Sequence, residues 1–302
     1  MNSLLDKTKK YIIAYAHGGI SNRIKCVVSA LRWANALKRE VALYWPKDYT
    51  CNCAFQDLFE NKITEIGSDV YENFEKHRFF SFFHNKYTLM DTWRLLVFGK
   101  ELRRGFGNVY PKALGESGGG SIDLEYERVP EAIREKFLIY FNNFVPVTYV
   151  RDQVNIFSQR FNKSTVSVAI RTWVDSGWRS KLFDINEFYR IMDTFPDANF
   201  FVTSDSSEIV RILAEKYNDR IIYYPKRTAN GDRSSVEGVQ DTLIDLLLAS
   251  KNKFLVGSHL STFSEVAWWF GECQAKVSIA SRQKYRKIFP YRFYIPVLSF
   301  RL

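Results

Sequence analysis

Residues 11–45, YIIAYAHGGISNRIKCVVSALRWANALKREVALYW, contain a strand–turn–helix–strand pattern. The apolar run at 11–16 predicts a buried strand, and the glycine pair that follows predicts the tight turn that ends it. From 24 to 37, apolar residues recur every three or four positions, which predicts a helix with one face toward a core. Residues 41–45 predict a second strand. A strand, a helix and a parallel strand form the βαβ unit of an α/β fold.

A second α/β series follows residue 150, and 302 residues are enough for two domains. We therefore predict one α/β domain at 1–150 and another at 151–302. Residues 66–112 and the glycine-rich stretch 116–121 are interpreted as loops of the first domain. The expected strands of the second domain lie at 166–170, 199–203, 220–224 and 254–256, and its expected helices at 185–195, 207–217, 240–251 and 264–270.

Parallel α/β sheets bind ligands beyond the carboxyl ends of their strands, so residues at those positions are candidate site residues. After the first strand come Gly18, Gly19, Asn22 and Arg23. Main-chain N–H groups at a helix start, beside an arginine, can bind a phosphate or a sugar. The alternative is a plain turn with an asparagine cap, and this element alone does not decide between the two.

Arg171 follows the apolar strand expected at 166–170. A guanidinium at this position is costly unless it faces a ligand or a carboxylate. It stays protonated at any working pH and can stabilise the charge that grows on a departing diphosphate. A structural ion pair is the alternative.

The other strand ends carry hydroxyl groups and a carboxylate. Ser258, Ser261 and Thr262 follow the strand at 254–256, where a turn enters a helix, and this arrangement can hold phosphates without a metal. Asp205 follows the strand at 199–203 and can accept a hydrogen bond from a ribose or a base, or it can cap the next helix.

Asp241 and Asp245 lie one helical turn apart on a strongly apolar helix. Carboxylates in such a setting require a partner. A carboxylate can accept both neighbouring N–H donors of a guanine edge, so these residues are candidates for base recognition.

The composition favours an anionic partner. The formal net charge is +10, which suits nucleic acid, an anionic membrane or the phosphates of a nucleotide. The dense basic runs of a nucleic-acid-binding arm are missing. The sequence contains no Asp-x-Asp pair, its four histidines show no zinc-ligand spacing, and Cys51 and Cys53 are too close together for a zinc knuckle. We therefore expect a site without a metal.

The first residues, MNSLLDKTKK, lack the apolar segment of a signal peptide, and no apolar run is long enough to span a membrane. We expect a cytoplasmic protein. The basic leader and the basic run 282–287 allow peripheral contact with an anionic membrane, although we favour the alternative of a solvated basic face.

Three blocks of this sequence resemble those of the fucosyltransferase superfamily that contains the bacterial nodulation α1,6-fucosyltransferase, the α1,2-fucosyltransferases and the protein O-fucosyltransferases. Residues 18–23 are similar to its N-terminal glycine-rich block, and Ala169-Ile170-Arg171 to its strand-end arginine motif. The most specific block is DLLLASKNKFLVGSHLSTF at 245–263. The three blocks occur in the family's order and together span most of the chain.

The resemblance implies a GT-B-like fold, in which two Rossmann-like α/β domains face a cleft and the C-terminal domain binds the nucleotide. It further implies inverting transfer of fucose from GDP-fucose to a glycan, glycolipid or glycoprotein, with no metal and no cofactor beyond this GDP-sugar cosubstrate. By position, Arg171 would assist the departure of GDP and Asp245 would read the guanine. The residues implied to surround the nucleotide and sugar are Asn22, Asp205, Ser261, Thr262 and Phe263.

The sequence departs from the family at three positions. Ala169 replaces a common histidine, Thr172 replaces the second arginine of some members, and the N-terminal loop lacks the glutamate that some relatives use as catalytic base. His17 and Asp175 are the candidates for the base, unless a loose, oxocarbenium-like reaction relies on the leaving group.

These departures leave the donor open. A UDP-sugar transferase of the same fold, such as a xylosyltransferase, is one alternative. A nonenzymatic protein that binds nucleic acid or an anionic membrane surface is another.

Overall fold

A computed structural model of the chain describes residues 11–76, 131–173 and 179–280, together with Leu5, Lys9 and Gly177. The predictions made for residues 77–112 and 116–121, for Asp175 and for the basic run 282–287 lie outside the described residues, as does most of the basic leader.

The N-terminal sheet has three parallel strands in the order β1-β2-β3: β1 (Tyr11–Tyr15), β2 (Glu40–Tyr44) and β3 (Thr64–Glu65). Helix α1 (Ile20–Leu37) connects β1 to β2 and completes the predicted βαβ unit. It begins four residues earlier than expected, because Gly19 takes the extended N-cap conformation and Gly18 turns the chain with a φ of +86°. Ser21, Asn22 and Arg23 therefore lie within the helix.

The C-terminal sheet has five parallel strands in the order β6-β5-β4-β7-β8. The order runs outward from β4 in both directions, so the topological switch point lies between β4 and β7, where doubly wound sheets bind ligands. The strands are β4 (Val166–Ile170), β5 (Phe200–Ser204), β6 (Ile221–Ile222), β7 (Phe254–Ser258) and β8 (Lys276–Ala280).

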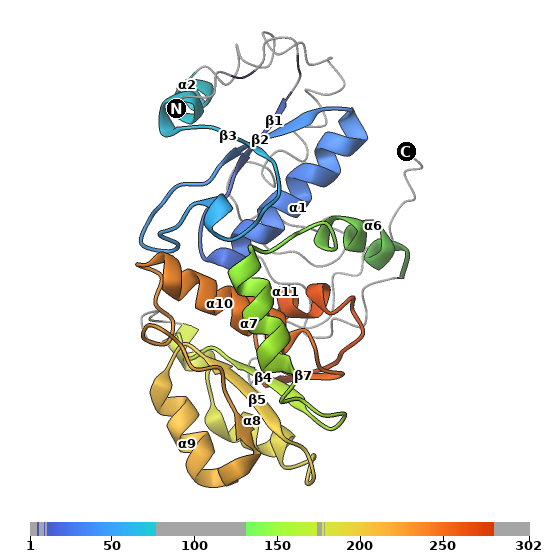
Figure 1. The fold of residues 1–302 in the computed structure, drawn as a ribbon, viewed down its shortest axis with the longest axis vertical. Helices are drawn as coiled ribbons and strands as arrows, with labels where there is room; N and C mark the ends of the chain where they lie inside the picture. Colours follow the sequence, from blue (N-terminus) through green and yellow to red (C-terminus); the bar gives the residue numbers. More distant parts are fainter. Residues whose placement is uncertain are drawn as a thin grey trace.

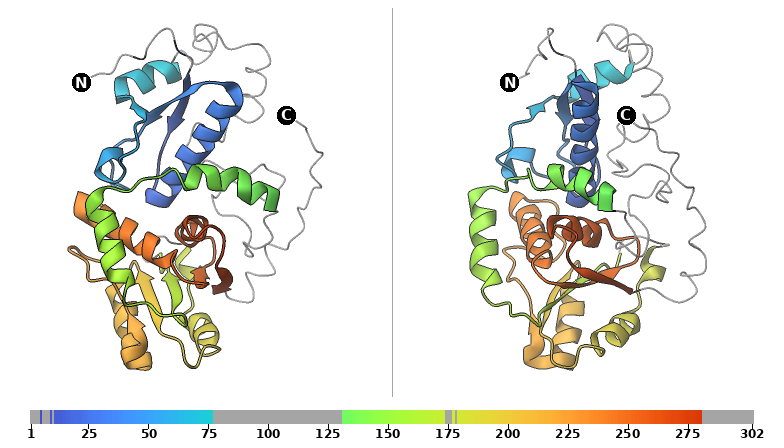
Figure 2. Two further views of the ribbon diagram at one scale, coloured as in Figure 1. Left: turned by 45° about the vertical axis from the view of Figure 1, so that its right-hand side comes forward. Right: turned by 90° about the vertical axis from the view of Figure 1, so that its right-hand side faces the viewer.

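Helices cover both faces of the C-terminal sheet, as Figures 1 and 2 show. Val166, Val168 and Ile170 point toward α8 and α9, whereas Ala169 packs in the cluster that includes α10 and α11. The helices that follow α1 are α2 (Ser68–Lys76), α6 (Glu131–Phe141), α7 (Thr148–Ser158), α8 (Ile185–Met192), α9 (Ser207–Tyr217), α10 (Val236–Ala249) and α11 (Thr262–Phe270).

Helices α10 and α11 form a layer between the two sheets (Figure 1). Trp268 and Trp269 on α11 are fully buried there, and Trp269 stacks on Phe141 of α6. One continuous apolar cluster contains residues of both sheets and of this layer. The predicted domain division at residue 150 falls inside α7 and stays a prediction.

Most predicted elements of the C-terminal half are present. The strand at 166–170 and the helix at 207–217 have the expected bounds. The helices expected at 240 and 264 begin earlier, because the side chains of Ser235 and Ser261 cap them. The predicted helix at 185–195 instead ends at Met192, and α6, α7 and β8 were not predicted. In the N-terminal half, β3 was not predicted, and the interpretation of residues 66–112 as a loop is wrong for 68–76, which form α2. Among the described residues, none of the helices has the length and apolar character needed to cross a bilayer.

Candidate active site

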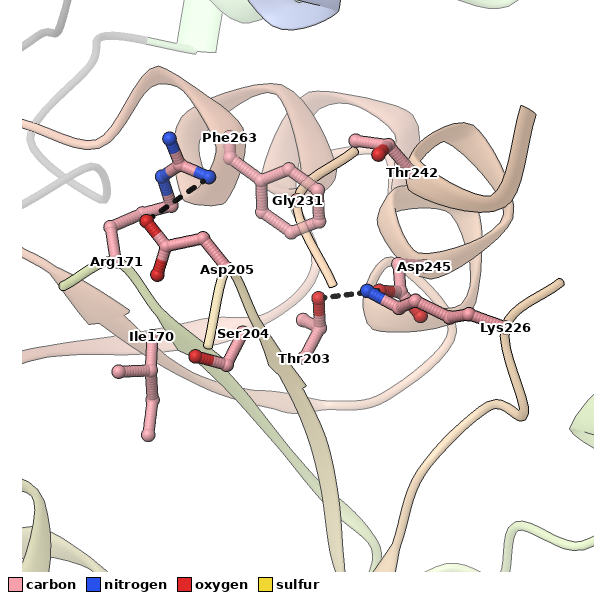
Figure 3. Close-up of a pocket in the computed structure, with 10 residues that line it drawn as sticks. All are labelled: Ile170, Arg171, Thr203, Ser204, Asp205, Lys226, Gly231, Thr242, Asp245 and Phe263. Atoms are coloured by element: carbon pink, nitrogen blue, oxygen red, sulfur yellow. Dashed lines mark hydrogen bonds and ion pairs between the residues drawn. The ribbon is translucent and has the colours of Figure 1, made fainter. Parts of the chain in front are cut away.

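A small pocket, partly open to solvent, lies at the carboxyl ends of β4 and β5. Figure 3 shows two polar groups around it: Arg171 with Asp205, and Lys226 with Thr203 and Asp245. Helices α10 and α11 supply its other walls. The lining residues are Ile170, Arg171, Thr203, Ser204, Asp205, Lys226, Gly231, Thr242, Asp245 and Phe263.

Arg171 leaves the end of β4 with its backbone fixed and its side chain partly accessible. Its main-chain N–H donates to the Ser258 hydroxyl at 2.7 Å. Its guanidinium lies 3.5 Å from a carboxylate oxygen of Asp205, and 23% of the side chain is exposed. Burial and the positive charges of Arg233 and Arg179 lower the pKa of Arg171, and Asp205 opposes them. An arginine remains charged in spite of such a shift, so the pocket has a fixed cation.

Asp205 holds Arg171 and is itself held by Thr172. The Thr172 N–H and hydroxyl both donate to Asp205 Oδ1, at 2.9 and 3.0 Å. The carboxylate thus accepts hydrogen bonds from the residue that follows Arg171 at the end of β4. It does not cap α9, which was the alternative role considered from the sequence. Gly231 packs closely against Asp205 and has a φ of +76°. A Cβ on Gly231 would lie 3.2 Å from the Asp205 carbonyl oxygen.

Asp245 presents a buried carboxylate that is only partly satisfied. Its Oδ2 accepts from the Thr203 hydroxyl at 2.9 Å and pairs with Lys226 Nζ at 2.6 Å. Within the part of the chain that the structure describes, its Oδ1 is buried with no hydrogen-bond partner. Burial raises the pKa of Asp245, while Lys226 and Thr203 act to lower it. A buried acceptor without a donor is costly, which suits a ligand that brings an N–H or O–H group.

The other carboxylate of the predicted pair has a separate role. Asp241 is 1% exposed and accepts from the Arg227 main-chain N–H at 2.7 Å and from its Nε at 2.9 Å. Both aspartates are therefore buried with basic partners, but only Asp245 lines the pocket.

The start of α11 contributes one pocket residue and several structural contacts. Phe263 lines the pocket, Thr262 is the first residue of the helix, and Ser261 is its N-cap. The Ser258 hydroxyl joins β7 to β4, because it also donates to the Ala169 carbonyl at 3.2 Å. Ser258 and Ser261 are each 3% exposed. Their predicted roles as phosphate contacts stay predictions, and the structure supplies a packing reason for both hydroxyls.

The candidate residues of the N-terminal loop are not among those that line the pocket. Arg23 is fully buried; its Nε donates to the Gly18 carbonyl and its Nη1 to the Pro46 carbonyl, each at 2.6 Å. It also pairs with Asp48 at 3.1 Å. A ligand is therefore not needed to explain this arginine. Asn22 packs beside Gly18, since a Cβ on that glycine would lie 3.0 Å from Asn22 Nδ2. Ligand contacts by Gly18, Gly19, Asn22 and Arg23 stay predictions.

Sequence reasoning did not name as candidates six of the ten residues that line the pocket: Ile170, Thr203, Ser204, Lys226, Gly231 and Thr242. Lys226 follows the end of β6, which is a further strand end of the same kind as those considered. Thr242 lies one turn before Asp245 on α10, so the two side chains share a face of the helix. This shared face could have identified Thr242 from the sequence.

Cys51 and Cys53 are buried with their sulfur atoms 3.6 Å apart. Among the described residues, no group of three or more histidine, cysteine, aspartate or glutamate side chains is arranged to hold a metal ion.

Comparison with protein-family models finds no match, and neither does comparison with curated proteins. Solved structures do match. Fucosyltransferase NodZ from Bradyrhizobium is 17% identical with a TM-score of 0.54, over 86% of this chain and 92% of that one. POFUT1 in complex with GDP-fucose is 12% identical with a TM-score of 0.55, over 93% and 99%.

A mutant of Arabidopsis thaliana FUT1 in complex with GDP is 15% identical with a TM-score of 0.55, over 90% of this chain and 70% of that one. At these identities the likeness concerns the fold. The chain has a fucosyltransferase-like GT-B fold, as the resemblance of its sequence blocks predicts.

Proposed function

We propose that this protein is an inverting glycosyltransferase that moves a sugar, L-fucose, from GDP-fucose to a hydroxyl of a glycan, glycolipid or glycoprotein, without a metal. The observation that carries the proposal is the position of Arg171. It is a partly exposed guanidinium at the carboxyl end of β4, held by Asp205 and flanked by the charges of Arg233 and Arg179. That is the place where doubly wound sheets bind nucleotides.

Arg171 suits the demands of a departing diphosphate. When the bond between the anomeric carbon and the β-phosphate oxygen breaks, negative charge grows on the phosphate. A fixed guanidinium stabilises that charge more than it stabilises the intact donor, which lowers the barrier. Asp205 keeps the guanidinium from changing position, because its other oxygen is anchored by Thr172.

The other half of the pocket suits a nucleobase. Lys226 is a hydrogen-bond donor, and the Asp245 Oδ1 beside it is a buried acceptor. Guanine presents a carbonyl oxygen next to an N–H on one edge, which matches this donor–acceptor pair. Phe263 offers a ring to the same pocket, as Figure 3 shows, and base–aromatic stacking contributes about 1–3 kcal/mol.

A UDP-sugar donor is the second candidate, because uracil also presents a carbonyl oxygen beside an N–H. It would satisfy the same pair of Lys226 and Asp245 with a smaller ring. Guanine has an additional amino donor on that edge, and Asp245 Oδ1 has two lone pairs to receive donors. We therefore favour GDP over UDP.

Calorimetric titration with GDP, UDP, ADP and CMP in EDTA tests the proposal. We expect selective GDP binding, about 10–100-fold weaker in Asp245→Asn, because a charged acceptor is lost. Arg171→Ala should lower the rate of fucose transfer by about 10²–10³-fold. The matched control is Arg211→Ala, which removes one exposed positive charge on α9.

Preference for UDP would keep the fold and change the donor. Binding of no nucleotide, or an Arg171→Ala variant with unchanged transfer, would contradict the proposed mechanism. A strict Mn²⁺ requirement for binding or transfer would count against the metal-free reaction. Salt-sensitive binding of nucleic acid or anionic vesicles, in place of nucleotide, would favour the nonenzymatic alternative.

A further inference from the structure

A histidine and an aspartate meet at the carboxyl edge of the N-terminal sheet. His17 follows β1 by two residues and Asp48 follows β2 by four. Because Tyr15 pairs with Tyr44 at the ends of these parallel strands, both loops leave the sheet at the same edge. His17 Nδ1 lies 3.5 Å from Asp48 Oδ2, and the side chains are 31% and 22% exposed.

The Asp48 carboxylate is built to stay ionised. Partial burial acts to raise the pKa of Asp48, but hydrogen bonds from the Thr50 hydroxyl and N–H and the charges of Arg23 and His17 outweigh it, so the pKa is lowered. The Thr50 N–H donates to Asp48 Oδ1 at 2.8 Å, and Arg23 Nη2 lies 3.1 Å from the same oxygen. Oδ1 is thus occupied by structural partners, and Oδ2 faces the imidazole.

His17 is confined from a second side by Tyr15. The Tyr15 hydroxyl lies 3.5 Å from His17 Nδ1, and the two ring centroids are 5.5 Å apart. Both contacts of Nδ1 are long, as hydrogen bonds in substrate-free active sites often are. With Asp48 at Nδ1, the proton of a neutral imidazole is favoured on Nδ1, and Nε2 becomes the basic atom.

The loop that carries Asp48 is joined to the wall of the nucleotide pocket. Asp48 forms a β-bridge with Cys51. The next residue, Asn52, donates from its main chain to the Arg233 carbonyl and from its side chain to the Ser234 carbonyl, each at 2.8 Å.

Two residues before Arg233, Gly231 lines the pocket against Asp205. The charge of Arg233 also acts on Arg171. These contacts connect the histidine–aspartate pair to the pocket through one short loop.

We propose that His17 is the general base of the transfer reaction and that Asp48 is the residue that positions it; this inference rests on the proposed function. His17 Nε2 takes the proton of the acceptor hydroxyl as that oxygen bonds to the anomeric carbon. The bond from this carbon to the β-phosphate oxygen breaks, and its electron pair leaves with GDP, whose charge Arg171 stabilises. His17 then releases its proton to water. This base replaces the glutamate that the N-terminal loop lacks.

The first test is the protonation state of His17, which needs no acceptor. Nitrogen NMR of protein labelled with ¹⁵N-histidine, with the His17 signal assigned by its loss in His17→Gln, should show a neutral imidazole protonated on Nδ1. Asp48→Asn should move that proton toward Nε2. The shift would show that Asp48 sets the tautomer of His17, and the kinetic test below shows whether that matters for transfer. A wild-type His17 protonated on Nε2 would overturn the proposal.

The second test uses water as the acceptor and measures GDP release from GDP-fucose. His17→Gln should lower kcat by about 10²–10⁴-fold, with the affinity for GDP unchanged by calorimetry. Asp48→Asn should also lower kcat. Glu40→Gln is the matched control, because Glu40 begins β2 at the opposite end from Asp48 and pairs with Lys9 at the surface.

The two proposals fail in different ways. If the wild-type protein does not bind GDP, the proposed function fails whatever the state of His17. If it binds GDP and releases it from GDP-fucose equally fast in His17→Gln, the nucleotide site stands and the assignment of the base is wrong.

Discussion

The ion pair between Lys25 and Glu265 offers a strong test of how the two sheets are joined. Lys25 lies on α1 and Glu265 on α11, with the ammonium 2.8 Å from a carboxylate oxygen. Their side chains are 1% and 0% exposed. Both charges are therefore fully removed from water, inside the layer that separates the sheets.

Breaking such a pair leaves one uncompensated buried charge, and the usual cost is about 3–5 kcal/mol. We therefore expect Lys25→Met to lower the free energy of unfolding by that amount. Glu265→Leu should have a similar effect, because it strands Lys25. The double variant should recover most of the loss, since an apolar pair of similar volume replaces both charges.

Urea unfolding followed by tryptophan fluorescence measures these free energies, because Trp268 and Trp269 lie on the same helix as Glu265. The exposed pair of Lys9 and Glu40, at 2.7 Å, is the control, and Lys9→Met should cost at most about 1 kcal/mol. A loss of less than about 1 kcal/mol for Lys25→Met would refute this reasoning. So would a double variant whose free energy of unfolding falls by the sum of the two single losses.

Two further predictions concern the packing of β7 and the loop before α10. Gly257→Ala should destabilise the protein by about 1–3 kcal/mol, because a Cβ would lie 2.9 Å from the buried side chain of Ser264. Urea unfolding measures this loss. An unchanged unfolding midpoint would contradict the close packing of β7 on α11.

Asp232 accepts hydrogen bonds from Ser234 and Ser235, which lower its pKa from 3.8 to about 2. The pKa of Asp232 is lower in the folded protein than in the unfolded chain, so the ionised carboxylate stabilises the fold. This stabilisation is present above about pH 4 and is lost as the pH falls toward 2. After a discount for solvent screening, it contributes about 1 kcal/mol to the free energy of unfolding. The wild-type advantage over Asp232→Asn in urea unfolding should therefore shrink between pH 6 and pH 3, and an advantage independent of pH would disprove the assignment.

The elements that sequence reasoning located well are those whose pattern is local. β4 is a five-residue strand, apolar except for Ser167 and buried on both faces, and its bounds were predicted correctly. Helix starts were predicted less accurately. The capping residue lies several positions before the first apolar residue of the periodic pattern, and the predictions were based on that pattern. Gly19, Ser235 and Ser261 each begin a helix before its apolar pattern becomes visible.

The candidate site shows the same division. Strand ends located Arg171 and Asp205 at the pocket, since parallel strands bring their carboxyl ends to one edge. Asp245 was found as a carboxylate on an apolar helix, and Phe263 through the family resemblance. The sequence did not show which of the two carboxylates on α10 would line the pocket. Asp241 and Asp245 look alike in sequence, and only tertiary contacts pair one with Arg227 and leave the other, among the described residues, with a buried oxygen that accepts no hydrogen bond.

The buried cations of α1 have partners that local sequence reasoning could not identify. Arg23 and Lys25 look like surface or phosphate-binding residues, yet their side chains are 0% and 1% exposed. Their partners, Asp48 and Glu265, lie 25 and 240 positions farther along the chain. Arg23 fixes the carboxylate that positions His17, and Lys25 fixes the helix that begins with Thr262 and Phe263. The same turn of α1 therefore holds the proposed base on one side and the wall of the proposed nucleotide pocket on the other.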